Sequence, residues 1–197
     1  MVSVGGSSKP SSAAEAEADP YEQARAIVLR QLTSAPRTRA QLAAALARRN
    51  VPDDVASAVL DRFEEVELVD DEDFARTWVR SRHSGRGLAR RALAHELRQR
   101  GVADDHVRDA VDEVSSEQEL ETARELVRRR LRTIHDDPDR AVRRLVGMLA
   151  RKGYGWGTAS RAVRDVLAEG VAGFGEPPGA DLVAALEEGE DADDGSG

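Results

Sequence analysis

Arginine side chains gather in two stretches of this 197-residue chain. Residues 82–108 hold seven arginines against three acidic residues, and residues 124–164 hold twelve basic residues against four acidic ones. Guanidinium groups pair bidentately with phosphates and with carboxylates, so such faces suit DNA or an acidic protein groove. For any single arginine the alternative is a solvated helix surface of i, i+4 ion pairs. The candidate partner- or nucleic-acid-binding residues are Arg82, Arg86, Arg90, Arg91, Arg98, Arg128, Arg129, Arg132, Arg143, Arg144, Arg151 and Lys152.

Other residue types give no catalytic pattern. The chain has no cysteine, which excludes disulfides, thiolate metal sites and a cysteine nucleophile. Residues 53–73 hold ten acidic residues and one arginine, and we interpret Asp70–Asp73 as helix-start residues rather than metal ligands. The four histidines, at positions 83, 95, 106 and 135, share no ligand spacing. We therefore expect a non-enzyme with no catalytic residue, cofactor or metal site.

Two tryptophans and one glycine-rich segment admit structural and functional interpretations. Trp78 shares an apolar stripe with Phe74, which predicts a core position. Trp156, between two glycines, is either a core plug or an exposed anchor for a partner or a base. Gly85-Arg86-Gly87 lacks the strand and the Gly-Lys-Ser/Thr of a phosphate loop, so we expect a flexible turn between helices.

Composition and charge bound the class of protein. The apolar residues make up 40% of the chain and aromatics 4%, so the core must consist of Leu, Val and Ala. The longest apolar run, 42–47, is too short to span a membrane, and with no signal peptide visible we expect a soluble cytoplasmic protein. The net charge of −8 is uneven, because residues 169–197 hold nine acidic residues and no Lys or Arg. Residues 20–168 carry a net charge of +3.

The elements that must position the arginines are helices. Apolar residues recur at i, i+3 and i+4 in nine stripes between residues 20 and 168, without strand alternation. Capping boxes are predicted at Thr38/Gln41 and Ser116/Glu119, and a cap before proline at Asp137-Pro138. Asn50, Gly101 and Gly153 suit left-handed helix stops.

Those three stops lie 51 and 52 residues apart and reveal an internal repeat. At the same offsets apolar residues correspond in four sets: Leu42/Leu93/Leu145, Leu46/Leu97/Leu149, Leu60/Val111/Val163 and Phe63/Val114/Val166. The prediction is an all-α fold of three tandem three-helix repeats that share apolar faces and form an elongated, curved helical array. The expected organisation is a disordered leader (1–19), repeats at 20–69, 70–115 and 116–169, and an acidic disordered tail (170–197).

A family resemblance lies in the middle of the chain. Residues 68–82 contain an acidic pair and Phe74-Ala75 in a predicted helix ending in arginine. A glycine-containing turn, then Glu96-Leu97 and Arg100-Gly101-Val102, follow in order. This pattern resembles the RecX family of regulatory proteins, and with the three-fold repeat the resemblance covers roughly residues 20–168.

The resemblance implies a function. RecX family members bind the RecA recombinase and its filament on single-stranded DNA, and they inhibit its ATPase, coprotease and strand-exchange activities. They thereby modulate DNA repair, recombination and the SOS response, and some also bind free DNA. We expect a chain that is a monomer in isolation and has no membrane partner. Groove binding, end capping and entry at filament gaps are all compatible with the sequence. The alternatives are a DNA-binding helical repeat that grips the phosphate backbone directly and a generic helical scaffold.

The charge asymmetry generates a prediction about the acidic segment from Glu169 onward. We expect this segment to compete with DNA for the basic faces of the same chain. Deleting residues 172–197 should strengthen DNA binding at low salt, because fewer like charges repel the phosphates. The measurement is DNA affinity by fluorescence anisotropy at low ionic strength, where an unchanged affinity would contradict the hypothesis.

Overall fold

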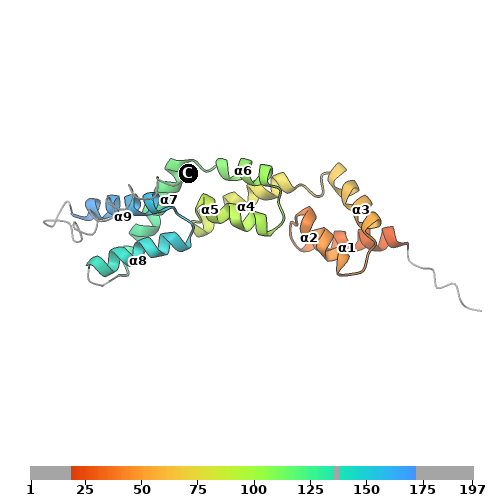
Figure 1. The fold of residues 1–197 in the computed structure, drawn as a ribbon, viewed down its shortest axis with the longest axis horizontal. Coiled ribbons are helices and arrows are strands. Elements are labelled where there is room, and N and C mark those ends of the chain that lie inside the picture. Colours follow the sequence, from red (N-terminus) through yellow and green to blue (C-terminus); the bar gives the residue numbers. More distant parts are fainter. Residues whose placement is uncertain (1–18, 135–137, 172–197) are drawn as a thin grey trace, which may run out of the picture. The chain divides into compact units, whose positions relative to one another are not determined.

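The computed structural model describes residues 19–134 and 138–171, and within these ranges the regular structure is nine α-helices (Figure 1). The compact unit that ends at Val69 contains α1 (Pro20–Ser34), α2 (Arg39–Ala47) and α3 (Asp53–Glu65). The unit that begins at Asp70 contains α4 (Asp71–Arg86), α5 (Arg90–Gln99), α6 (Asp104–Asp112), α7 (Ser116–Leu131), α8 (Pro138–Arg151) and α9 (Trp156–Val171). The predicted all-α fold is confirmed. The expectations for residues 1–18, His135, Asp137 and 172–197 lie outside the described ranges.

Each set of three consecutive helices has its own apolar core. Separate clusters of buried side chains form within α1–α3, within α4–α6 and within α7–α9. All twelve residues that the repeat aligns are buried, including Leu93, Leu97, Leu145 and Leu149 with no exposed surface. The three-helix repeat is therefore confirmed. The repeat boundaries and the elongated, curved arrangement stay predictions.

Most helix ends follow the predicted signals. Thr38 and Gln41 form the expected capping box at α2, where each side chain bonds the other's backbone amide. The carboxylate of Asp70 accepts from the backbone N–H of Asp73 at 2.9 Å and caps α4. Asn50 and Gly153 have φ of 57° and 91°, the left-handed conformation predicted for these stops. Gly101 has φ of 77° and ends α5 in the same way.

Two predicted helix ends are displaced. The capping box of α7 is Ser115 with Gln118, and not Ser116 with Glu119. Both pairs fit the same pattern, but the Glu119 carboxylate instead accepts the backbone N–H of Arg90 at 2.8 Å. It thereby caps α5, whose N-cap residue Ala89 has no side chain for this bond. Gly85 and Arg86 do not form the predicted turn, because α4 continues through them to a left-handed C-cap at Gly87.

Within the second unit, hydrogen bonds join the α4–α5 turn (residues 87–89) to the α8–α9 turn (residues 152–154). We call this contact the seam. The N–H of Ala89 donates to the carbonyl of Lys152 at 3.0 Å, and the Tyr154 hydroxyl donates to the carbonyl of Gly87 at 3.2 Å. Burial raises the pKa of the Tyr154 hydroxyl, so it keeps the proton that it donates. Hydrogen bonds thus join the second and third repeats at these turns, and the expectation of shared apolar faces stays a prediction. Ala89 is the residue of this turn that joins the third core.

Because Gly153 has no side chain, the α8–α9 turn can lie close to Ala92 of α5. A Cβ atom at this position would lie 2.6 Å from the Cβ and 2.7 Å from the backbone nitrogen of Ala92, at a positive φ that side chains rarely adopt. Both the conformation and the close approach therefore require glycine.

Substituting Leu97, which is buried, tests the prediction that its face of α5 packs into the core of the second repeat. Leu97→Ala should lower the free energy of unfolding by about 2–5 kcal/mol, because it leaves a cavity in the second core. Leu29→Ala is the matched control, because Leu29 is 41% exposed, and it should change stability by no more than about 0.5 kcal/mol. Urea denaturation measures both values, and a loss below about 1 kcal/mol for Leu97→Ala would show that this helix face is misplaced.

A second prediction concerns the seam. Gly153→Ala should destabilise the protein by about 1–3 kcal/mol, because the added methyl group meets Ala92 at an unfavourable φ. Gly85→Ala is the control, since its Cβ would meet nothing within 4 Å in the last turn of α4, and it should stabilise by about 0.5–1 kcal/mol. Urea denaturation of the two variants compares them directly. Equal effects would mean that the close approach at Gly153 contributes no stability.

Candidate functional site

Three of the predicted arginines line one groove, which we call the basic groove. It lies between α5 and the turn from α8 to α9 and has a volume of about 500 Å³. Arg91, His95 and Arg98 occupy positions i, i+4 and i+7 of α5, so they share one helix face. Arg151 enters from the last residue of α8. The remaining lining residues are Ala92, Ala150, Gly153 and Tyr154.

The basic groove is positively charged and contains no carboxylate among its lining residues. Arg91 and Arg151 are exposed, and neither has an ion-pair partner within the part of the chain that the structure describes. Arg98 donates from Nε to Asp104 at 2.7 Å, with both side chains more than half exposed. Such an exposed pair contributes little stability, so Arg98 retains donors for another anion. Small side chains beneath three guanidinium groups suit a phosphate or carboxylate ligand.

Arg86, Arg90 and Lys152 belong to the seam instead. The Lys152 ammonium donates to the carbonyl of Arg86 at 2.5 Å, which ties α4 to the residue after α8. The Arg90 guanidinium pairs with Asp112 at the end of α6. The backbone of Arg90 and the side chain of Lys152 are thus structural, whereas the Arg86 side chain is exposed.

Arg82 is held against Trp78. Its guanidinium lies 4.1 Å from the centre of the indole ring, and that of Arg100 lies 3.7 Å from it. The indole N–H donates to Glu96 at 2.8 Å, and the ring stacks on Phe74. Trp78 is therefore half-buried at the edge of the second core, which confirms its packing role but not complete burial.

The second arginine cluster contains one residue held by two carboxylates and four that are exposed. Arg128 donates to Glu121 at 2.8 Å and to Glu169 at 2.9 Å, and these bonds lower the pKa of both carboxyls. The stability from these ion pairs is present at neutral pH and is lost as the pH falls through the lowered pKa values. The other four candidates of this cluster are exposed and do not line the basic groove: Arg129, Arg132, Arg143 and Arg144.

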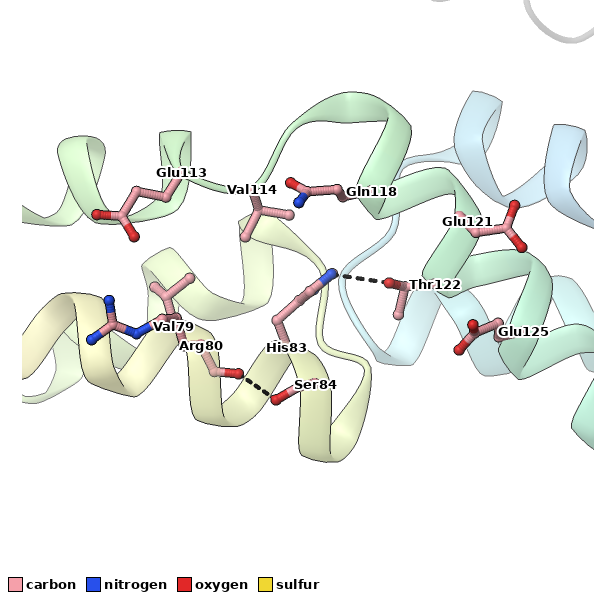
Figure 2. A pocket seen from close by; sticks show the side chains of 10 residues that line it. All are labelled: Val79, Arg80, His83, Ser84, Glu113, Val114, Gln118, Glu121, Thr122 and Glu125. Atoms are coloured by element: carbon pink, nitrogen blue, oxygen red, sulfur yellow. Dashed lines mark hydrogen bonds between the residues drawn. The ribbon is translucent and has the colours of Figure 1, made fainter.

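A larger hollow, of about 690 Å³, has the opposite character (Figure 2). His83 of α4 reaches Thr122 of α7 across it, because its Nε2 lies 3.0 Å from the Thr122 hydroxyl, while its Nδ1 lies 2.9 Å from the carbonyl of Leu88. A carbonyl only accepts, so Nδ1 donates and, in the neutral ring, Nε2 accepts from Thr122. Three carboxylates line this hollow: Glu113, Glu121 and Glu125. It therefore disfavours a phosphate.

The sequence did not indicate every residue that matters here. His95 and Tyr154 line the basic groove without having been candidates, although the i, i+4, i+7 spacing of residues 91, 95 and 98 signals one shared face. Trp156 is 49% exposed, so its interpretation as a core plug is wrong and the anchor alternative is favoured. Within the described ranges no three metal-binding side chains cluster, and none of the helices is long and apolar enough to cross a membrane.

Comparisons with known proteins identify the same family for all three repeats. Models of the first, second and third three-helix domains of RecX match residues 24–63, 70–111 and 117–163. The regulatory protein RecX of Thermobifida fusca is 62% identical over 164 residues, which cover 82% of this chain and 89% of that protein. The RecX of Streptomyces coelicolor is 56% identical over 168 residues, which cover 84% and 89%.

A solved structure has the same fold. The crystal structure of RecX from Lactobacillus salivarius superposes with a TM-score of 0.69, covering 76% of this chain and 97% of that one at 19% identity. The family models and the close relatives together span the three repeats that carry the basic groove and the seam. The chain therefore belongs to the RecX family of regulatory proteins.

Proposed function

We propose that this chain binds the RecA recombinase and its filament on single-stranded DNA, and that it inhibits ATP hydrolysis, coprotease activity and strand exchange. It acts in DNA repair and recombination by stoichiometric binding rather than by catalysis. Membership of a family of regulatory proteins supports a regulatory role. The observation that carries the choice of partner is the basic groove, because a RecA filament presents both phosphates and carboxylates to an arginine-lined surface.

The proposed mode of inhibition is mechanical. A filament protomer must move relative to its neighbours for ATP hydrolysis and strand exchange to proceed. Three helical repeats that contact successive protomers restrict these movements without any chemical step. The join between the two repeats of the second unit supports this mode, because the backbone N–H of Ala89 and the Tyr154 hydroxyl each donate a hydrogen bond across it.

A second candidate function is direct binding of free DNA. Two exposed arginines without ion-pair partners in the described part of the chain, Arg91 and Arg151, favour it. Phosphate contacts release counterions, so affinity would fall steeply with salt. Contacts with RecA carboxylates leave the salt dependence of DNA binding unchanged. A pull-down with RecA, with and without single-stranded DNA and nucleotide, separates the two functions from a generic scaffold.

Charge reversal in the basic groove tests the proposal. Arg91→Glu with Arg151→Glu should remove inhibition of RecA-driven strand exchange and ATP hydrolysis, because attraction becomes repulsion. The fold should persist, because exposed substitutions shift stability by no more than about 0.5 kcal/mol. The helix dipole favours Glu near the start of α5 and disfavours it at the end of α8, so these two effects oppose each other.

Arg30→Glu with Arg49→Glu is the matched control, because it makes the same change of charge on exposed residues of the first unit. The control should inhibit RecA like the parent. In the groove variant, each lost phosphate contact should flatten the log–log salt slope of DNA binding by about 0.9 on duplex or about 0.7 on single strands. Lost inhibition with an unchanged slope means that these arginines face RecA. If the folded Arg91→Glu, Arg151→Glu variant inhibits RecA as fully as the parent, the basic groove is not the RecA-binding site.

A further inference from the structure

Trp156 presents an exposed indole at the start of α9. It is the first residue of this helix, and 49% of its surface is exposed. A Cβ atom at Gly155 would meet no atom within 4 Å, so the surface directly before the indole is open. Tryptophan is enriched among the residues that anchor protein contacts, because its ring buries a large apolar area. The indole is therefore suited to contact with another polypeptide segment.

The basic groove lies next to this indole along the chain. Gly153 and Tyr154 line the groove, and Trp156 follows Tyr154 by two residues. The Cα atoms of Tyr154 and Trp156 are thus at most about 7.6 Å apart. Trp156 does not line the groove itself, but a peptide of several residues can contact both. An apolar ring next to three guanidinium groups fits a segment in which apolar residues adjoin carboxylates.

Residues 182–194 of the same chain have this composition. Three large apolar side chains come first: Leu182, Val183 and Leu186. Six of the next eight residues, 187–194, are acidic, and the segment contains no Lys or Arg. Its charge is opposite to that of the groove, whose lining residues include three arginines and no carboxylate. The apolar part and the acidic part adjoin at residues 186 and 187, as the indole and the groove adjoin along the chain.

The length of chain between α9 and this segment allows the contact. Val171 ends α9 and lies about 22 Å from Trp156 along the helix axis. Eleven residue steps lead from Val171 to Leu182, and they span up to about 36 Å when extended. Covalent attachment gives such a segment an effective concentration on the order of millimolar. Contacts that are individually weak can therefore compete with a separate partner.

We propose that residues 182–194 dock on the surface formed by Trp156 and the basic groove, with their leucines on the indole and their carboxylates on the groove's arginines. The docked segment covers the groove, so a RecA filament must displace it. This regulatory consequence rests on the proposed function, whereas the docking itself does not. Salt weakens the docking, because the charges on an exposed groove are screened.

Acrylamide quenching of tryptophan fluorescence in the full chain, without RecA, tests the docking. Leu182→Ala with Leu186→Ala should increase the quenching and shift the emission maximum to longer wavelength, because Trp156 loses its cover. Leu29→Ala is the matched control, because it changes another exposed leucine, on the first unit, and it should alter neither value. In a Trp156→Phe background the difference should disappear, since Trp78 is covered by two arginines in every variant.

Charge reversal locates the acidic part of the segment. Arg91→Glu with Arg151→Glu should increase the quenching as the leucine variant does, because the groove then repels the carboxylates. Arg161→Glu is the control, because Arg161 is 62% exposed on α9 and lines a different hollow, of about 440 Å³. It should leave the quenching unchanged. Increased quenching in Arg161→Glu but not in the groove variant would overturn the assignment to the basic groove.

Inhibition of RecA-driven strand exchange measures the regulatory consequence. Leu182→Ala with Leu186→Ala should inhibit at a roughly tenfold lower concentration than the parent, the factor expected if the segment leaves about a tenth of the grooves open. If this variant increases the quenching while neither protein inhibits RecA, the proposed function fails and the docking stands. Equal inhibition by both proteins would overturn the regulation.

Two results of the fluorescence experiment would overturn the docking. The first is equal quenching in the parent and in the Leu182→Ala, Leu186→Ala variant, which would mean that nothing in this segment covers the indole. The second is quenching of the parent that falls as its concentration rises, which would mean that a second copy covers Trp156 instead of a segment of the same chain.

Discussion

The contact between Gly153 and Ala92 is the constraint on which the second unit depends. It allows the α8–α9 turn to approach the backbone of α5 closely enough for Ala89 to donate to Lys152. Arg91 and Arg151 are near neighbours of these contacting residues in the sequence. Their separation across the basic groove is thus set by backbone contacts rather than by flexible side chains. Loosening the seam would widen the groove and weaken any bidentate hold on an anion.

Ion pairing divides the arginines into structural and available groups. Arg82 and Arg128 are half-buried and held by carboxylates, and Arg82 also lies on an aromatic ring, so they stabilise packing. Arg91 and Arg151 are exposed and line the basic groove, so binding an anion there does not require breaking a buried ion pair. Density of arginine along the sequence does not distinguish these groups, because Glu96 and Glu169, which pair with Arg82 and Arg128, lie on other helices.

The three repeats bury equivalent apolar residues in their cores but carry different residues on their surfaces. Equivalent apolar residues are buried in all three, and each repeat has a left-handed stop at the equivalent position. Asn50 meets that conformational need in the first repeat, whereas Gly153 meets both the conformational need and the close approach to Ala92. The exposed Trp156 follows this stop in the third repeat. The scaffold is thus shared, and each repeat presents different chemistry on it.

The sequence alone determined the helices, their buried faces, the three-fold repeat and most helix ends. The helices, their buried faces and most of their ends depend on residues within about four positions of one another, so periodicity and capping chemistry are enough to specify them. The repeat is visible because the same local pattern recurs after 51 and 52 residues. The tertiary structure decided that Ser115 and Gln118, rather than Ser116 and Glu119, form the capping box of α7. The Glu119 carboxylate instead accepts a hydrogen bond from the backbone N–H of Arg90. The tertiary structure also decided that Arg91 and Arg151, sixty positions apart, share a groove and that Trp156 stays exposed. Those outcomes depend on how the repeats dock, and docking is set by backbone approach between distant turns, for which local patterns carry no signal.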